Sequence, residues 1–111
     1  HSDDKKNKYQ LAYKISQLIG DEKNLYIINM GLIPQYYLTN TIPPNLSTIG
    51  YNFGKSLTFE KNLKQVNSAA YILKYKMEFS DYTNAAEINA ELRKFEKIDI
   101  NRDVILYRSF K

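Results

Sequence analysis

The sequence predicts an α/β domain, a three-layer α/β/α sandwich with a mixed sheet of about four to five strands. Three observations lead to this class. Segments with the 3.6-residue period of a helix alternate with short apolar segments rich in β-formers. Residues 25–30 form an apolar run interrupted only by Asn29, which is typical of a strand covered on both faces. The last two apolar segments flank a short polar turn, so we expect a largely parallel sheet with a C-terminal antiparallel hairpin.

Length and composition indicate a single soluble domain. The chain has 111 residues, of which 43% are hydrophobic and 25% are charged, which suffices for a core and argues against disorder. No run approaches the roughly 18 apolar residues of a membrane span, and no signal peptide is visible. The chain begins with His1 and Ser2 and no methionine. We take these two as residues left from cloning, and residues 3–111 as a domain excised from a larger protein.

The first half of the chain is predicted as helix, strand and short helix. Residues 8–19 carry apolar side chains at helical spacing, and Gly20 stands where a helix commonly ends. The buried strand at residues 25–30 follows, and we expect it in the middle of the sheet. A helix of about two turns is expected at residues 33–40, because Pro34 suits the first helical position, where no N–H is needed.

The second half continues the alternation and closes with the hairpin. Residues 41–54 contain two prolines and two glycines without any apolar period. They predict an ordered loop that folds over the sheet. Whether this loop adds a further strand is left open. Long loops in compact domains are often functional. The remaining elements are expected as a helix at 58–66, a second central strand at 69–75, a loop at 77–83, a helix at 84–95 and strands at 96–100 and 104–110.

The charge pattern leaves the class of partner open. The net charge is +4, and five lysines between residues 55 and 76 face one acid, Glu60. A basic surface suits nucleic acid, anionic lipid or an anionic substrate, while a solvated face is the plainer alternative. We expect no nucleic-acid partner.

The sequence contains no recognisable catalytic or metal-binding constellation. His1 is the only histidine and there is no cysteine, which argues against His-based triads, His-ligated metals and thiol catalysis. Gly50 and Gly54 precede Lys55 at the wrong spacing for a phosphate-binding loop. We therefore expect no catalytic residue, no metal and no cofactor in this chain.

Tyrosines near the end of the first strand are the candidates for a binding site. Tyr36 and Tyr37 follow that strand, and Tyr51 lies in the long loop near Lys55. Together they could form an aromatic, basic rim that stacks on a sugar or a nucleobase. The alternative is that one of Tyr36 and Tyr37 packs in the core while the others shield the edge of the sheet.

The central stretch of the chain reads GLIPQYYLT at residues 31–39 and IPP at residues 42–44. It resembles the segment after the last membrane helix in many membrane glycosyltransferases of the GT-C class, the protein-mannosyltransferase-like and aminoarabinose-transferase-like enzymes. The strand at 69–75 and the Leu-Tyr-Arg at 106–108 are similar to later parts of that domain. The arginine usual near the second proline is absent here, and Asn45 stands close to its place.

The resemblance implies the C-terminal domain of a membrane protein, on its extracytoplasmic (periplasmic or extracellular) side. The parent enzyme would transfer a sugar from a polyprenyl-phosphate carrier to an acceptor, with its catalytic acid outside this chain. The implied partners are the transmembrane portion of the same polypeptide and either the lipid-phosphate-linked sugar or an anionic membrane surface. Ligand or acceptor contacts are then expected at Tyr36, Tyr37, Asn45, Tyr51 and Lys55, and membrane-facing charges at Lys55, Lys61 and Lys64.

The rival hypothesis is a free-standing α/β module that binds a ligand or a protein and has no enzymatic activity. The two hypotheses differ in what precedes the domain. Apolar spans upstream in the parent reading frame support the glycosyltransferase, and a start codon just before residue 3 supports the free-standing module.

Overall fold

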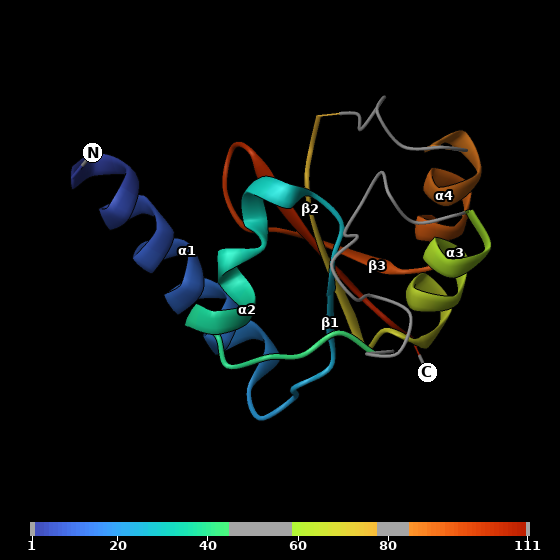
Figure 1. Ribbon diagram of the computed structural model, residues 1–111, viewed down its shortest axis with the longest axis horizontal. Coiled ribbons are helices and arrows are strands. Elements are labelled where there is room, and N and C mark those ends of the chain that lie inside the picture. The colour runs from blue at the N-terminus through green and yellow to red at the C-terminus, as the bar shows by residue number, and fades with distance from the viewer. Residues whose placement is uncertain (1, 45–58, 78–84, 111) are drawn as a thin grey trace.

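Four strands form one mixed sheet in the computed structural model, which describes residues 2–44, 59–77 and 85–110 (Figure 1). The strand order is β1-β2-β4-β3. Strand β1 (Leu25–Ile27) runs parallel to β2 (Tyr71–Tyr75). Strand β4 (Val104–Arg108) runs antiparallel to both β2 and β3 (Glu96–Asp99). The α/β class and the C-terminal hairpin are confirmed.

The sheet is largely antiparallel, which corrects the expectation of a largely parallel sheet. The reason is the position of the hairpin. Its second strand, β4, lies directly beside β2, so β2 has one parallel and one antiparallel neighbour. Helix α3 (Phe59–Ser68) belongs to the connection between β1 and β2, the parallel pair that requires a crossover.

Strand β1 lies at the edge of the sheet, whereas its apolar sequence predicted a central position. Its burial is nevertheless complete, because residues 25–28 are at most 1% exposed. The chain that follows β1 covers its free edge. The N–H of Ile27 donates to the hydroxyl of Tyr36 at 2.8 Å, and the N–H of Leu25 donates to the carbonyl of Ile42 at 3.0 Å. This protected edge leaves few backbone groups of β1 for another chain to pair with.

Helix α1 (Ser2–Ile19) begins at residue 2, earlier than the predicted residue 8. Leu11, Ile15 and Ile19 repeat every four residues and are buried, as a helix with one apolar face requires. The helix ends at Gly20, whose φ of +61° is the left-handed conformation expected there.

A short 3-10 helix, η1 (Met30–Leu32), and helix α2 (Pro34–Leu38) follow β1. Pro34 occupies the start of α2 as predicted. The helix is shorter than the predicted range of 33–40, because Asn40 adopts a φ of +54° and ends it.

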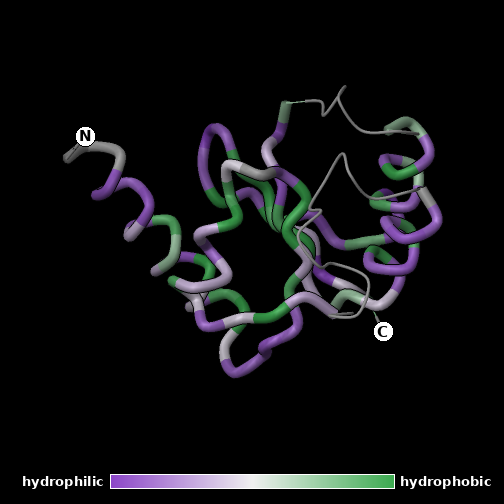
Figure 2. Tube along the Cα trace, in the orientation of Figure 1, coloured by the Kyte–Doolittle hydropathy of each residue, from purple (hydrophilic) through white to green (hydrophobic). Residues whose placement is uncertain are grey.

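Two clusters of buried apolar side chains lie on opposite faces of the sheet, since successive strand residues alternate between faces. One contains strand residues together with residues of α3 and of α4 (Ala85–Leu92). The other contains strand residues together with residues of α1 and Leu32. In Figure 1 the helices α1 and α2 accordingly lie to one side of the strands and α3 and α4 to the other. The hydrophobic segments concentrate in the strands between them (Figure 2).

Parts of two predicted loops fall outside the described residues. These are residues 45–54 of the long loop and residues 78–83 of the loop after β2. Residue 84, the first of the predicted helix at 84–95, also lies there. Within the loop, Ile42 forms a single parallel bridge with Asn24. Among the helices that the structure describes, none has the length and apolar character needed to cross a bilayer.

Candidate functional site

A cleft of about 430 Å³ lies beyond the carboxyl ends of β1 and β2, between the start of α1, η1 and the hairpin turn. Its polar lining residues are Asn7, Lys8, Gln35, Tyr75, Asn101 and Asp103. In open α/β sheets, the carboxyl ends of parallel strands are where ligands bind, because helix starts and loops converge there. The size is within the usual range of small-molecule sites.

The floor of the cleft depends on a close approach between η1 and β2. A Cβ atom at Gly31 would lie 2.6 Å from the hydroxyl of Tyr75, so the ring occupies space that any other residue would fill. Asn29 fixes the same strand end, because its Oδ1 accepts the N–H of Tyr75 at 2.8 Å. The ring of Tyr75 therefore lies directly beside the backbone of Gly31 at the cleft.

Gln35 is the most unusual residue of the cleft. Its side chain is only 2% exposed, and its Nε2 donates to the carbonyl of Lys8 at 3.1 Å. Its Oε1 is buried and finds no hydrogen-bond partner in the described part of the chain. An unpaired buried amide oxygen costs about 1–3 kcal/mol, so Gln35 brings an unused hydrogen-bond acceptor to the wall of the cleft.

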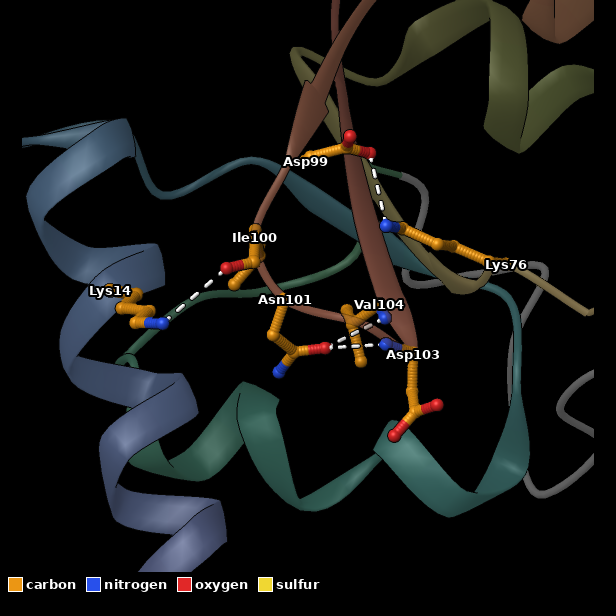
Figure 3. A network of polar contacts seen from close by, with 7 residues as sticks. All are labelled: Lys14, Lys76, Asp99, Ile100, Asn101, Asp103 and Val104. Carbon is orange, nitrogen blue, oxygen red and sulfur yellow. Dashed lines mark hydrogen bonds and ion pairs between the residues drawn. The ribbon is translucent and has the colours of Figure 1, made fainter.

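The hairpin turn forms the opposite wall and is held by its own side chains (Figure 3). The Oδ1 of Asn101 accepts the N–H groups of Asp103 and Val104 at 2.8 and 2.9 Å. Lys14 of α1 donates to the carbonyl of Ile100 at 3.4 Å and ties the turn to the helix. The carboxylate of Asp103 stays 73% exposed at the cleft.

These groups together suit a polyhydroxylated ligand. Amide and carboxylate oxygens accept hydrogen bonds from hydroxyl groups, while the free amide N–H₂ of Asn101 can donate to them. The ring of Tyr75 offers an apolar surface for a sugar ring.

The two predicted tyrosines are separated by the structure. Tyr36 is half-buried, packs against the core beside α1 and accepts the N–H of Ile27. Tyr37 is 89% exposed and lines a hollow of about 330 Å³ between α1 and α2. That hollow also contains Lys5 and Tyr9, and it shares Lys8 and Pro34 with the cleft.

The other predicted site residues are not brought to this cleft by the described structure. Asn45, Tyr51 and Lys55 lie outside the described residues. Lys61 and Lys64 are exposed on α3, which packs on the other face of the sheet from α1. Tyr37 and these two lysines therefore belong to different surfaces.

Sequence reasoning missed Gln35, Tyr75, Asn101 and Asp103. The available signals were Gly31 directly after an apolar strand and the polar Asn-Arg-Asp turn, which the sequence suggested only as a hairpin turn. The Leu-Tyr-Arg ending, noted for its resemblance, has a local role. Arg108 donates to Glu96 across the hairpin, and this hydrogen bond and the Glu96 charge raise the pKa of Arg108 above its ordinary value.

Neither a metal site among the described residues nor a similar known protein was found that would help to assign the cleft. Within residues 2–44, 59–77 and 85–110, no group of three or more His, Asp or Glu side chains could hold a metal ion. Comparison with protein-family models, with curated proteins and with solved structures finds no match.

Proposed function

We propose that this chain is a non-catalytic binding domain on the extracytoplasmic side of a membrane glycosyltransferase, as the sequence resemblance implies. The parent transfers a sugar from a polyprenyl-phosphate carrier to an acceptor, and the domain, a three-layer α/β/α sandwich, works against the transmembrane part of the same polypeptide. The cleft beyond β1 and β2 contacts the sugar. The unpaired amide oxygen of Gln35 is the observation that supports this binding role most directly.

The physical argument starts from the free energy that Gln35 costs. A buried amide oxygen without a partner destabilises the folded chain, and a leucine would fill the same space without that cost. A sugar hydroxyl that reaches this oxygen recovers the lost hydrogen bond. Residues that lower stability in this way are characteristic of functional sites.

The hollow between α1 and α2, which adjoins the cleft, suits the phosphate and the prenyl chain of such a carrier. Lys8 borders both spaces and brings a positive charge to their junction, where the phosphate of the carrier would lie. Tyr9, Tyr37 and Leu38 offer apolar surface beyond it for the first prenyl unit. The proposal thus assigns sugar, phosphate and prenyl chain to adjoining places.

The test is a titration with farnesyl-phosphate-linked mannose, a short-chain analogue of such donors, in which isothermal titration calorimetry measures the Kd. The wild-type chain should bind it saturably. Gln35→Leu should raise the Kd about tenfold, the value of one hydrogen bond, while the free energy of unfolding stays within about 1 kcal/mol of wild type. Chemical denaturation measures the second quantity.

The matched control is Gln17→Leu, because Gln17 is exposed on α1 and hydrogen-bonds only the hydroxyl of Tyr13 among the described residues. It should leave the Kd unchanged. Saturable binding that survives Gln35→Leu at full strength would refute the role of the cleft, and so would wild-type protein that never saturates.

A free-standing binding module is the second candidate, and one observation favours it. Tyr9, Tyr13 and Tyr37 are 54%, 65% and 89% exposed on α1 and α2, an apolar surface of the kind that protein partners use. The parent reading frame decides between the candidates. Apolar spans upstream support the glycosyltransferase, and a start codon directly before residue 3 supports the module.

A further inference from the structure

A second, strongly basic pocket lies on the other face of the sheet, between β2, β3 and the end of α4. Its volume is about 280 Å³. Among the described residues it is lined by four cationic side chains, two polar ones and one apolar one: Lys74, Lys76, Arg93, Lys97, Asn89, Tyr107 and Leu92. Four cations around one small pocket repel one another, which an anion would relieve.

The strand register brings these side chains together. Lys97 of β3 pairs with Tyr107 of β4, and Lys74 of β2 pairs with Ile105 one step along the same face. Arg93 directly follows the last residue of α4 and approaches from above the sheet. Backbone pairing therefore fixes the relative positions of Lys74, Lys97 and Tyr107.

The charges of the pocket are only partly compensated. The ammonium of Lys76 lies 3.3 Å from the carboxylate of Asp99. Lys74 is only 4% exposed, and its Nζ donates to the carbonyl of Tyr75 at 2.6 Å. Arg93 and Lys97 form no ion pair within the described part of the chain. Arg93 and Lys97 therefore bring to the pocket two positive charges that no acid of the described residues pairs with.

Neutral donors complete the pocket. Burial raises the pKa of Tyr107 above its ordinary value, so its hydroxyl keeps its proton at neutral pH and can donate a hydrogen bond. The amide of Asn89 adds two further donors at the wall. Charged and neutral donors that converge in this way match the several acceptor oxygens of a phosphate.

We propose that this pocket binds the dianionic phosphate group of a phosphorylated ligand. The site lies on the face opposite the sugar-contacting cleft and shares no residue with it. The two proposals are therefore independent, and either can fail while the other stands.

The test is a ¹⁵N-NMR titration of the 111-residue chain with inorganic phosphate at constant ionic strength. Amide shifts should saturate and concentrate in β2, β3 and residues 88–93. Arg93→Gln and Lys97→Gln, both at exposed positions, should each raise the Kd roughly tenfold, as expected for loss of one charge-assisted hydrogen bond. Lys6→Gln removes the same charge from an exposed site on α1, which packs on the other face of the sheet, and should leave the Kd unchanged.

Vesicle sedimentation identifies the source of the phosphate. If the chain binds vesicles that contain phosphatidic acid, and both Arg93→Gln and free phosphate weaken this binding, the ligand is a lipid headgroup. Saturable phosphate binding without sedimentation identifies a soluble phosphate ester. Shifts that never saturate, or an equal loss of affinity in Lys6→Gln, would overturn the proposal.

Discussion

Adjacent tyrosines have unrelated roles at the residue scale. The hydroxyl of Tyr36 accepts the N–H of Ile27, a residue that is 1% exposed, whereas Tyr37 is 89% exposed. Removing the first hydroxyl leaves a buried backbone donor without its partner, and removing the second leaves only solvent contacts behind. Two equally conservative changes are therefore expected to differ in their effect on stability.

Tyr36→Phe should lower the free energy of unfolding by about 1–3 kcal/mol, the cost of an unsatisfied buried donor. Tyr37→Phe should change it by less than about 0.5 kcal/mol, as is usual at the surface. Urea denaturation followed by circular dichroism measures both. Equal stabilities of the two variants would show that the hydroxyl of Tyr36 does not support the edge of β1.

The sequence could not assign these roles, and the reason is the length of the helix. A five-residue helix such as α2 has too few turns for an apolar period to show which tyrosine faces inward. Gln35 was missed for a related reason, because glutamine is usually exposed and its burial here depends on contacts with α1. Local sequence therefore predicts that a helix forms here, but it does not predict which polar side chains of that helix are buried.

At the scale of elements, β1 shows what an apolar run predicts and what it does not. Complete burial of residues 25–28 agrees with the prediction, but the position at the sheet edge does not. Burial and an edge position are compatible because the free edge of β1 is covered by the chain. Ile42 donates its N–H to the carbonyl of Lys23 at 2.8 Å, and its own carbonyl accepts the N–H of Leu25. The chain itself supplies the cover that a neighbouring strand was expected to give.

Ile42→Pro tests this cover, because it removes the N–H that bonds to Lys23. The variant should lose about 1–2 kcal/mol of the free energy of unfolding and show faster amide exchange in β1. Ile42→Ala is the control, since the side chain is 54% exposed and the N–H is kept. Its stability should stay within about 0.5 kcal/mol of wild type. Identical losses in both variants would assign the effect to the side chain.

The element predictions succeeded where capping chemistry was clear. Gly20 ends α1 and Pro34 begins α2 as expected. Helix α4 ends at Leu92, short of the predicted residue 95, because Phe95 turns back toward the core in front of β3. Helix ends thus follow local signals, and tertiary contacts override them where a strand begins at once.

At the scale of the molecule, strand order is what the sequence did not predict. Each strand carries its own period, but the choice of β4 as the neighbour of β2 depends on pairing between residues far apart in the chain. The cleft was missed for the same reason, since it combines α1, η1, β2 and the hairpin turn. Helices and strands follow from local sequence, whereas the cleft follows from how these elements are arranged in the fold.

The charge distribution supports one prediction at this scale. Lys61 and Lys64 lie exposed on α3, where they are proposed to face an anionic membrane. Lys61→Glu with Lys64→Glu should weaken sedimentation with phosphatidylserine vesicles roughly tenfold or more, because each surface lysine contributes about 1 kcal/mol.

The control is Lys6→Glu with Lys23→Glu, which changes the net charge equally at exposed positions on α1 and in the turn that follows it. It should retain most of the vesicle binding. Parallel losses in the two double variants would indicate a response to total charge and remove α3 from the proposed membrane surface.

The closed margin at β1 also limits how copies of this chain could associate. In the described part of the chain, β3 is the one terminal strand without a covering segment, and it is short and carries Glu96, Lys97 and Asp99. A sheet with a single open edge can pair edge to edge with one further copy about a two-fold axis, and no open edge then remains for a third copy. Fibril growth by strand addition is thereby arrested at the dimer.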